Sequence, residues 1–224
     1  MGLRRWTGIA ILLTLPATSV VAQSWTTESW ELGTMAGRGS SRHEDVYAPI
    51  YLKAQKTYSD PITAFSYGAT LAYGIEWVKL ESGLLYYSEG GRYGGGAADR
   101  ISSLQIPLLA RATSPALAGV RLMATWGFAQ SHPVSCRGFV SPNNPGGFSS
   151  PEPFDGCGSR EAGWIGWPSW MRSRVLGAGV ALGRGQLQYR AEWRWYRGPD
   201  LDPNTDYQSR TLSRSFVFTM AFRP

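Results

Sequence analysis

The sequence predicts an all-β fold, an eight-stranded antiparallel up-and-down transmembrane β-barrel. Three observations support this prediction. Apolar and polar residues alternate with the period of a β-strand, and helical periodicity is nearly absent. Most alternating segments are about 10 to 15 residues long, whereas strands of soluble proteins average about 5 to 6 and a tilted membrane strand needs about 9 to 11. Short and long connections follow each other in turn, as they do in outer-membrane barrels.

The N-terminal residues have the pattern of a secretory signal peptide. Arg4 and Arg5 supply a positive region, an apolar run begins at Ile9, and small side chains end at Ala22. This apolar run is too short to span a bilayer, which takes roughly 20 residues. We therefore expect a cleaved signal peptide over residues 1–22 and a barrel domain over residues 23–224, exported to the bacterial outer membrane.

The strands and connections can be assigned in order. The eight predicted strands are 27–38, 62–73, 75–88, 101–113, 116–130, 171–183, 186–196 and 211–222. Tight turns at 74, 114–115 and 184–185 alternate with long connections at 39–61, 89–100, 131–170 and 197–210. With an even number of strands, this alternation places all the long loops at one end and both termini at the other.

The segment 187–196 shows most clearly which side chains face inward. Leu187 and Trp193 lie on its apolar face, and Arg190 and Glu192 lie on the opposite face. In a membrane barrel the apolar face meets lipid and the polar face fills the lumen. The same parity predicts a set of lumen residues: Glu31, Lys79, Glu81, Gln105, Arg111, Arg121, Gln188, Arg190, Glu192 and Arg194. Because side chains just fill the interior of eight strands, we expect a salt-bridged, closed lumen.

Arg214 departs from this pattern. Its parity matches Phe216 and Phe218, which are predicted to face lipid. It lies near the outer end of its strand, where an arginine can extend to the interface or meet lipopolysaccharide phosphates.

The chain has two cysteines, Cys136 and Cys157, in one long connection. An exported chain meets an oxidising compartment, so a disulfide is expected, which closes a loop of roughly 20 residues and contributes about 3 kcal/mol. The alternative is a metal site that includes His132, a poor ligand set. The same connection carries Trp164, Trp167 and Trp170, which either contact sugars or a partner or join the aromatic girdle.

Few residues in the sequence suggest chemistry. The two histidines, His43 and His132, fall in predicted loops and are interpreted as solvated. The glycine-rich run at 90–96 lacks the Lys-Ser/Thr of a phosphate-binding loop. Oxygen-bearing side chains at alternate positions, Asp200, Asp202, Asn204 and Asp206, suggest calcium, but the glycine and closing glutamate of an EF-hand are absent. We therefore expect no catalytic residues, no cofactor and no metal.

Three segments resemble a known family. The run from Lys79 to Gly91, the run from Ser103 to Arg111 and the run from Val175 to Val180 resemble the third, fourth and sixth strands of the PorT-like outer-membrane β-barrel family. The resemblance covers most of residues 27–222 and implies the barrel fold without shared catalytic residues. Ser103 and Gln105 replace the family's usual Tyr and Glu, and the chain continues past Phe222 instead of ending on an aromatic residue.

These features predict a structural or surface-interaction protein and not an enzyme. Its expected partners are outer-membrane lipid, lipopolysaccharide and an extracellular or envelope protein, with no nucleic acid. Three alternatives stay open: a narrow channel or secretion-associated barrel, an enzyme active at the outer rim, and a secreted lipocalin-like barrel. The sequence leaves the ligand, the conduction of solutes and the oligomeric state undecided.

Overall fold

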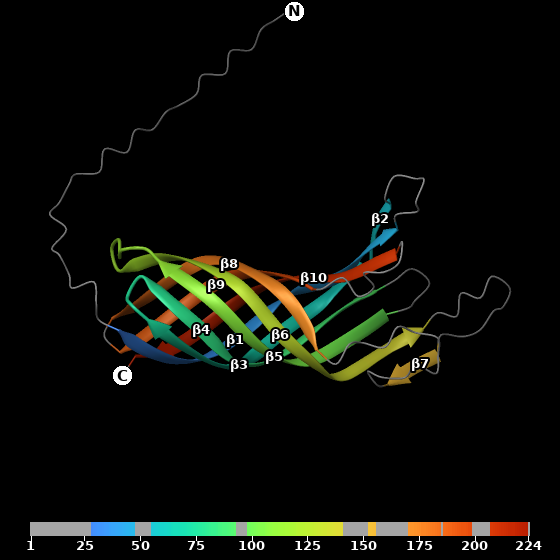
Figure 1. The fold of residues 1–224 in the computed structure, drawn as a ribbon, viewed down its shortest axis with the longest axis horizontal. Helices are drawn as coiled ribbons and strands as arrows, with labels where there is room; N and C mark the ends of the chain where they lie inside the picture. The colour runs from blue at the N-terminus through green and yellow to red at the C-terminus, as the bar shows by residue number, and fades with distance from the viewer. Residues whose placement is uncertain are drawn as a thin grey trace, which may run out of the picture.

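The computed structural model describes residues 28–47, 55–92, 98–140, 152–155, 170–184, 186–198 and 207–223. The predicted signal peptide lies outside these residues. Regular structure in the described part consists of β-strands (Figure 1). No helix within this part is long and apolar enough to cross a membrane.

Eight long strands close into one antiparallel barrel. Each strand pairs with the next along the chain, and the last pairs with the first. The strands are β1 (Ser29–Tyr47), β3 (Asp60–Gly74), β4 (Val78–Arg92), β5 (Ala98–Thr113), β6 (Val120–Val140), β8 (Met171–Arg184), β9 (Leu187–Arg197) and β10 (Tyr207–Phe222). Two short strands, β2 (Gln55–Tyr58) and β7 (Glu152–Asp155), extend β1 and β6 in hairpins. The predicted eight-stranded up-and-down barrel is confirmed.

The strands are staggered around the barrel. A path that starts at Leu32 and follows the paired residues from strand to strand returns to β1 at Arg42, ten residues farther along. Such a stagger accompanies the strand tilt that closes a barrel. As a result, side chains at one level of the lumen come from very different positions in the sequence.

The two ends of the barrel differ. β1 begins and β10 ends at the left of Figure 1, where short connections join β3 to β4, β5 to β6 and β8 to β9. The hairpin strands β2 and β7 lie at the opposite end. We call these the short-turn end and the long-loop end. This sorting of the connections follows the predicted alternation.

The strands at the long-loop end are longer than predicted. β1 continues to Tyr47 and β6 to Val140, whereas the sequence pattern ends near residues 38 and 130. These extensions are held by backbone pairing to neighbouring strands, so they do not need the alternating apolar pattern that marks the rest. The assignment of His43 and His132 to loops is therefore wrong: they lie in β1 and β6.

Apolar and charged side chains are inverted relative to a soluble barrel. Leu187 and Trp193 are 46% and 38% exposed, while Arg190 and Glu192 are 3% and 2% exposed. The same alternation holds along the other barrel strands, which direct large apolar side chains outward and polar ones inward. The chemistry of this protein therefore divides into a polar interior and an apolar outer surface.

Candidate functional site in the barrel interior

Glu81 lies at the centre of a buried ion-pair network. It comes from β4, and its side chain is fully buried. Its Oε2 accepts a hydrogen bond from Arg111 Nη1 at 2.8 Å, and its Oε1 accepts one from Arg194 Nη2 at 2.9 Å. Arg190 donates to the same carboxylate. One carboxylate thus links β4, β5 and β9 across the lumen.

A second carboxylate, Glu31, extends this network toward the short-turn end. Glu31 pairs with Lys79 at 3.5 Å, with Arg223 at 3.0 Å and with Arg111, which also contacts Glu81. Arg223 was not among the predicted lumen residues because it follows the last predicted strand, which ends at Phe222. The signal available in the sequence was parity: Phe222 faces outward, so the next residue faces inward.

Glu192 completes the network at the level of Arg194. Its Oε2 accepts a hydrogen bond from Arg194 Nε at 2.8 Å. Gly177 on the neighbouring strand β8 leaves room for this carboxylate, because a Cβ atom there would lie 2.0 Å from Glu192 Oε1. Gly177 thus serves the packing of a charged side chain in the lumen.

The other predicted lumen residues lie outside this network. Arg121 pairs with Glu76 near the short-turn end, where both side chains are partly exposed. Gln105 is buried and donates to Ser131 Oγ at 3.1 Å. Gln188 is half-buried. The predicted inward set therefore separates into one connected network and three residues with local partners or none.

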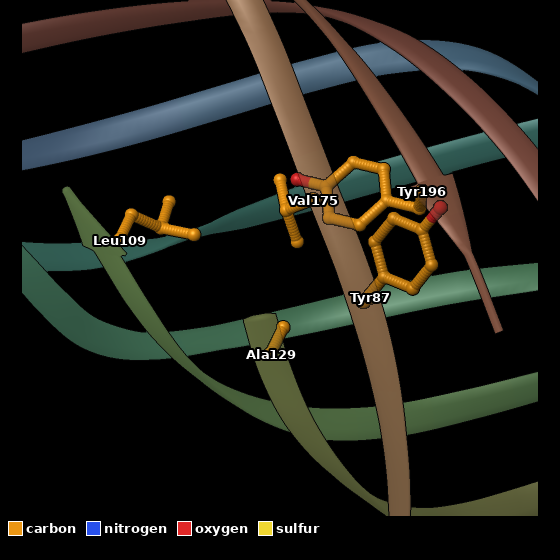
Figure 2. Packing of buried hydrophobic residues seen from close by; sticks show 5 residues of the cluster. All are labelled: Tyr87, Leu109, Ala129, Val175 and Tyr196. Carbon is orange, nitrogen blue, oxygen red and sulfur yellow. The ribbon is translucent and has the colours of Figure 1, made fainter. Parts of the chain in front are cut away.

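An apolar layer fills the lumen on the long-loop side of the charges. The side chains of this layer come from β4, β5, β6, β8 and β9 and are Tyr87, Leu109, Ala129, Val175 and Tyr196. Figure 2 shows them pointing into the barrel. The rings of Tyr87 and Tyr196 pack with centroids 5.1 Å apart. Met35, Leu85 and Val217 form a second buried cluster. Charged and apolar layers thus both cross the lumen.

A polar cluster around His43 lies beyond the apolar layer, toward the long-loop end. His43 is 1% exposed, and its Nε2 lies 2.9 Å from Asp99 Oδ1. Its Nδ1 lies 3.3 Å from Thr211 Oγ1, and its backbone N–H donates to Ser59 Oγ. The interpretation of His43 as a solvated histidine is therefore wrong, because Asp99 and Thr211 are brought to it from strands distant in the sequence.

This cluster has the three group types of a hydroxyl–imidazole–carboxylate site. The carboxylate of Asp99 can orient the ring of His43, and the ring can accept the proton of the Thr211 hydroxyl. Thr211 and His43 are both buried, and Asp99 is the partly exposed member. Farther out, the hydrogen bond from Arg210 lowers the pKa of the Glu44 carboxyl.

The predicted features of the long connections are mostly outside the described residues. Cys136 is buried near the end of β6, and Cys157 is not described, so their disulfide stays a prediction. Trp164, Trp167 and the acidic residues from Asp200 to Asp206 also lie outside the described residues. Trp170 is 53% exposed and packs against His132, with ring centroids 5.1 Å apart.

Comparison with known proteins gives no family. No family model matches the chain, and no curated protein matches it. The resemblance to PorT-like barrels therefore stays a prediction.

Several solved structures are similar in outline. Neisserial surface protein A is 11% identical, with 82% of this chain and 95% of that chain covered and a TM-score of 0.38. OprG from Pseudomonas aeruginosa is 13% identical, with 85% and 94% covered and a TM-score of 0.39. The outer membrane protease OmpT from Escherichia coli is 10% identical, with 87% and 96% covered and a TM-score of 0.39. At these low TM-scores, the fold assignment rests on the strand pairing of this chain and not on these likenesses.

Proposed function

We propose that this chain is an outer-membrane β-barrel protein with a structural or surface-interaction role. The inversion of its surfaces carries the proposal: charged side chains fill the inside, and large apolar side chains cover the outside. Monomeric soluble proteins rarely expose apolar patches larger than a few hundred Å². Lipid hydrocarbon around the barrel removes the cost of exposing these apolar side chains. The closed strand pairing also leaves no unpaired backbone edge facing the lipid.

The filled interior argues against a conducting role. An open channel needs a water-filled path between its two ends. Here the Glu81 network crosses the lumen at one level and the apolar layer with Tyr87 and Tyr196 crosses it at another. In this proposal the barrel anchors its long-loop end outside the cell, where exposed groups such as Trp170 are available to an envelope or extracellular protein.

The proposal predicts two results for the refolded protein, one in gel electrophoresis and one in planar bilayers. The unboiled sample is expected to migrate faster than the boiled sample in a gel, because a closed barrel resists detergent. Planar bilayers containing the folded form are expected to show no steady conductance. A soluble protein without a mobility shift would contradict the membrane assignment, and a stable single-channel current would contradict the closed lumen.

The His43 cluster favours a second candidate function, hydrolysis near the outer end of the barrel. In this candidate the Thr211 oxygen attacks an ester carbonyl, and His43 takes the hydroxyl proton while Asp99 holds the imidazole in place. The ester C–O bond then breaks, the alcohol leaves with the proton from His43, and water hydrolyses the acyl-threonine to release the acid. The burial of Thr211 and His43 weighs against it, because a substrate has to reach both groups. Opening of the long-loop end would be required first.

The hydrolysis candidate predicts activity of the refolded barrel on p-nitrophenyl butyrate. The T211V variant is expected to lose the activity and keep the heat-dependent mobility shift, while S213A serves as a matched hydroxyl control on the same face of β10. Absence of activity in the unmodified protein, or equal loss in both variants, would contradict the candidate.

A further inference from the structure

The outward face changes abruptly from uncharged side chains to arginine on four adjacent strands. From the short-turn end, the outward run on β8 ends at Leu176 and is followed by Arg174. On β9 the run ends at Trp195 and is followed by Arg197. Arg214 on β10 and Arg38 on β1 occupy the corresponding places. These strands thus share a border where the apolar surface meets cations.

Two of these arginines, Arg174 and Arg197, and the next outward residue on β8, Arg172, form what we call the arginine cluster. All three are exposed. Arg174 and Arg197 are direct partners in the β8–β9 register. Like charges directly opposite each other in a sheet destabilise it. Within the described part of the chain, the salt bridges involve none of the three.

The arginine cluster also lines an open groove in the outer wall. The groove has a volume of about 880 Å³, within the range of small-molecule sites. Its apolar lining comes from β4, β5 and β6 and includes Leu80, Leu108, Ala110, Trp126 and Phe128. Trp126 is 68% exposed. An apolar wall next to three cations is complementary to an amphiphilic ligand with an anionic headgroup.

The polar and apolar parts of the groove lie in a fixed order. Phe128 pairs with Arg174 across the β6–β8 ladder, and Trp126 pairs with Leu176, two residues nearer the short-turn end. The Arg172 guanidinium lies 3.9 Å from the centre of the Phe128 ring. The cations therefore lie toward the long-loop end and the apolar wall toward the middle of the barrel, in the order of headgroup and acyl chain in an outer leaflet.

We propose that this groove binds a phosphate-bearing glycolipid of the outer leaflet, lipopolysaccharide, through its lipid A part. The phosphate oxygens lie between Arg174 and Arg197, because guanidinium groups bind phosphate with paired hydrogen bonds. An acyl chain lies along Trp126 and Leu108. The inference rests on the proposed outer-membrane location, which puts the long-loop end at the outer leaflet.

Binding of purified lipid A to the full barrel in detergent micelles tests the site, with tryptophan fluorescence as the readout. The probes are diphosphorylated lipid A, dephosphorylated lipid A, phosphatidylglycerol and inorganic phosphate. The unmodified protein is expected to bind diphosphorylated lipid A and to bind the other three more weakly. The double variant R174Q/R197Q is expected to weaken this binding about ten-fold or more, since hydrogen bonds to charged groups are strong.

A matched double variant controls for the change in net charge. Arg92 and Arg100 are exposed arginines of the β4–β5 hairpin and do not line the groove. R92Q/R100Q is expected to bind diphosphorylated lipid A as the unmodified protein does. Equal weakening in both double variants, or no preference for the phosphorylated lipid A, would overturn the site. Equal binding of phosphatidylglycerol or inorganic phosphate would overturn the assignment to lipopolysaccharide.

The heat-dependent mobility shift separates failure of this inference from failure of the proposed function. A shifted band without lipid A binding would overturn the groove assignment and leave the membrane barrel in place. Absence of the shifted band in the unmodified protein would overturn the membrane barrel, on which the inference depends. A shifted band for R174Q/R197Q is the check that a loss of binding does not reflect misfolding.

Discussion

Replacing Glu81 with glutamine is expected to destabilise the folded barrel by about 3–5 kcal/mol, the cost of breaking a buried ion pair by removing one partner. The E81Q variant keeps the size of the side chain and removes its charge. Arg111, Arg190 and Arg194 then face one another in the lumen with one fewer carboxylate. The free energy of unfolding in urea, followed by tryptophan fluorescence in vesicles, measures the loss.

The matched control for E81Q is E76Q, the same substitution in a partly exposed pair. Glu76 pairs with Arg121, and their side chains are 33% and 24% exposed. Exposed ion pairs contribute only about 0–1 kcal/mol, so E76Q is expected to change the free energy of unfolding little. Similar losses in the two variants would show that burial does not govern the strength of the network and would refute its central role.

An arginine in the middle of the apolar outer face is expected to cost about 2–4 kcal/mol in a lipid bilayer. Leu108 is the middle one of five outward uncharged positions on β5, and it is opposite Phe128 and Ser82. The L108R variant forces a charge into hydrocarbon at that level. The free energy of unfolding in vesicles measures the cost.

Leu104 provides the control for depth on the same strand. It is 41% exposed against 47% for Leu108, and it lies opposite His132 near the long-loop end. The L104R variant is expected to cost only about 0–1 kcal/mol, because arginine near the interface reaches water. Equal and small effects of L108R and L104R would mean that water and not lipid surrounds the barrel.

Strand parity carried much of the fold prediction. Alternation over two residues placed Leu187 and Trp193 outside and Arg190 and Glu192 inside, because successive side chains of a strand point to opposite faces. The order of short and long connections predicted that the barrel has a short-turn end and a long-loop end. The sequence pattern did not predict the polar extensions of β1 and β6, because backbone hydrogen bonds hold these extensions without an apolar face.

The His43 cluster could not be predicted from local sequence patterns. His43 was interpreted as a solvated loop histidine, but it is buried, and its partner in the folded chain is Asp99, 56 residues away. Contacts across the lumen depend on the stagger of all eight strands, which no local pattern contains.

The sequence by itself determined that this chain forms long alternating strands, which side chains face inward, and where its connections are short or long. Only the tertiary structure decided that Glu81 joins three arginines, that Arg223 enters the network, and that arginines of β8 and β9 border an apolar wall from β4 to β6. The physical reason is the distance along the chain over which each feature is determined. Side-chain facing follows from the local backbone period, whereas ion pairing and grooves depend on the register and closure of the whole barrel.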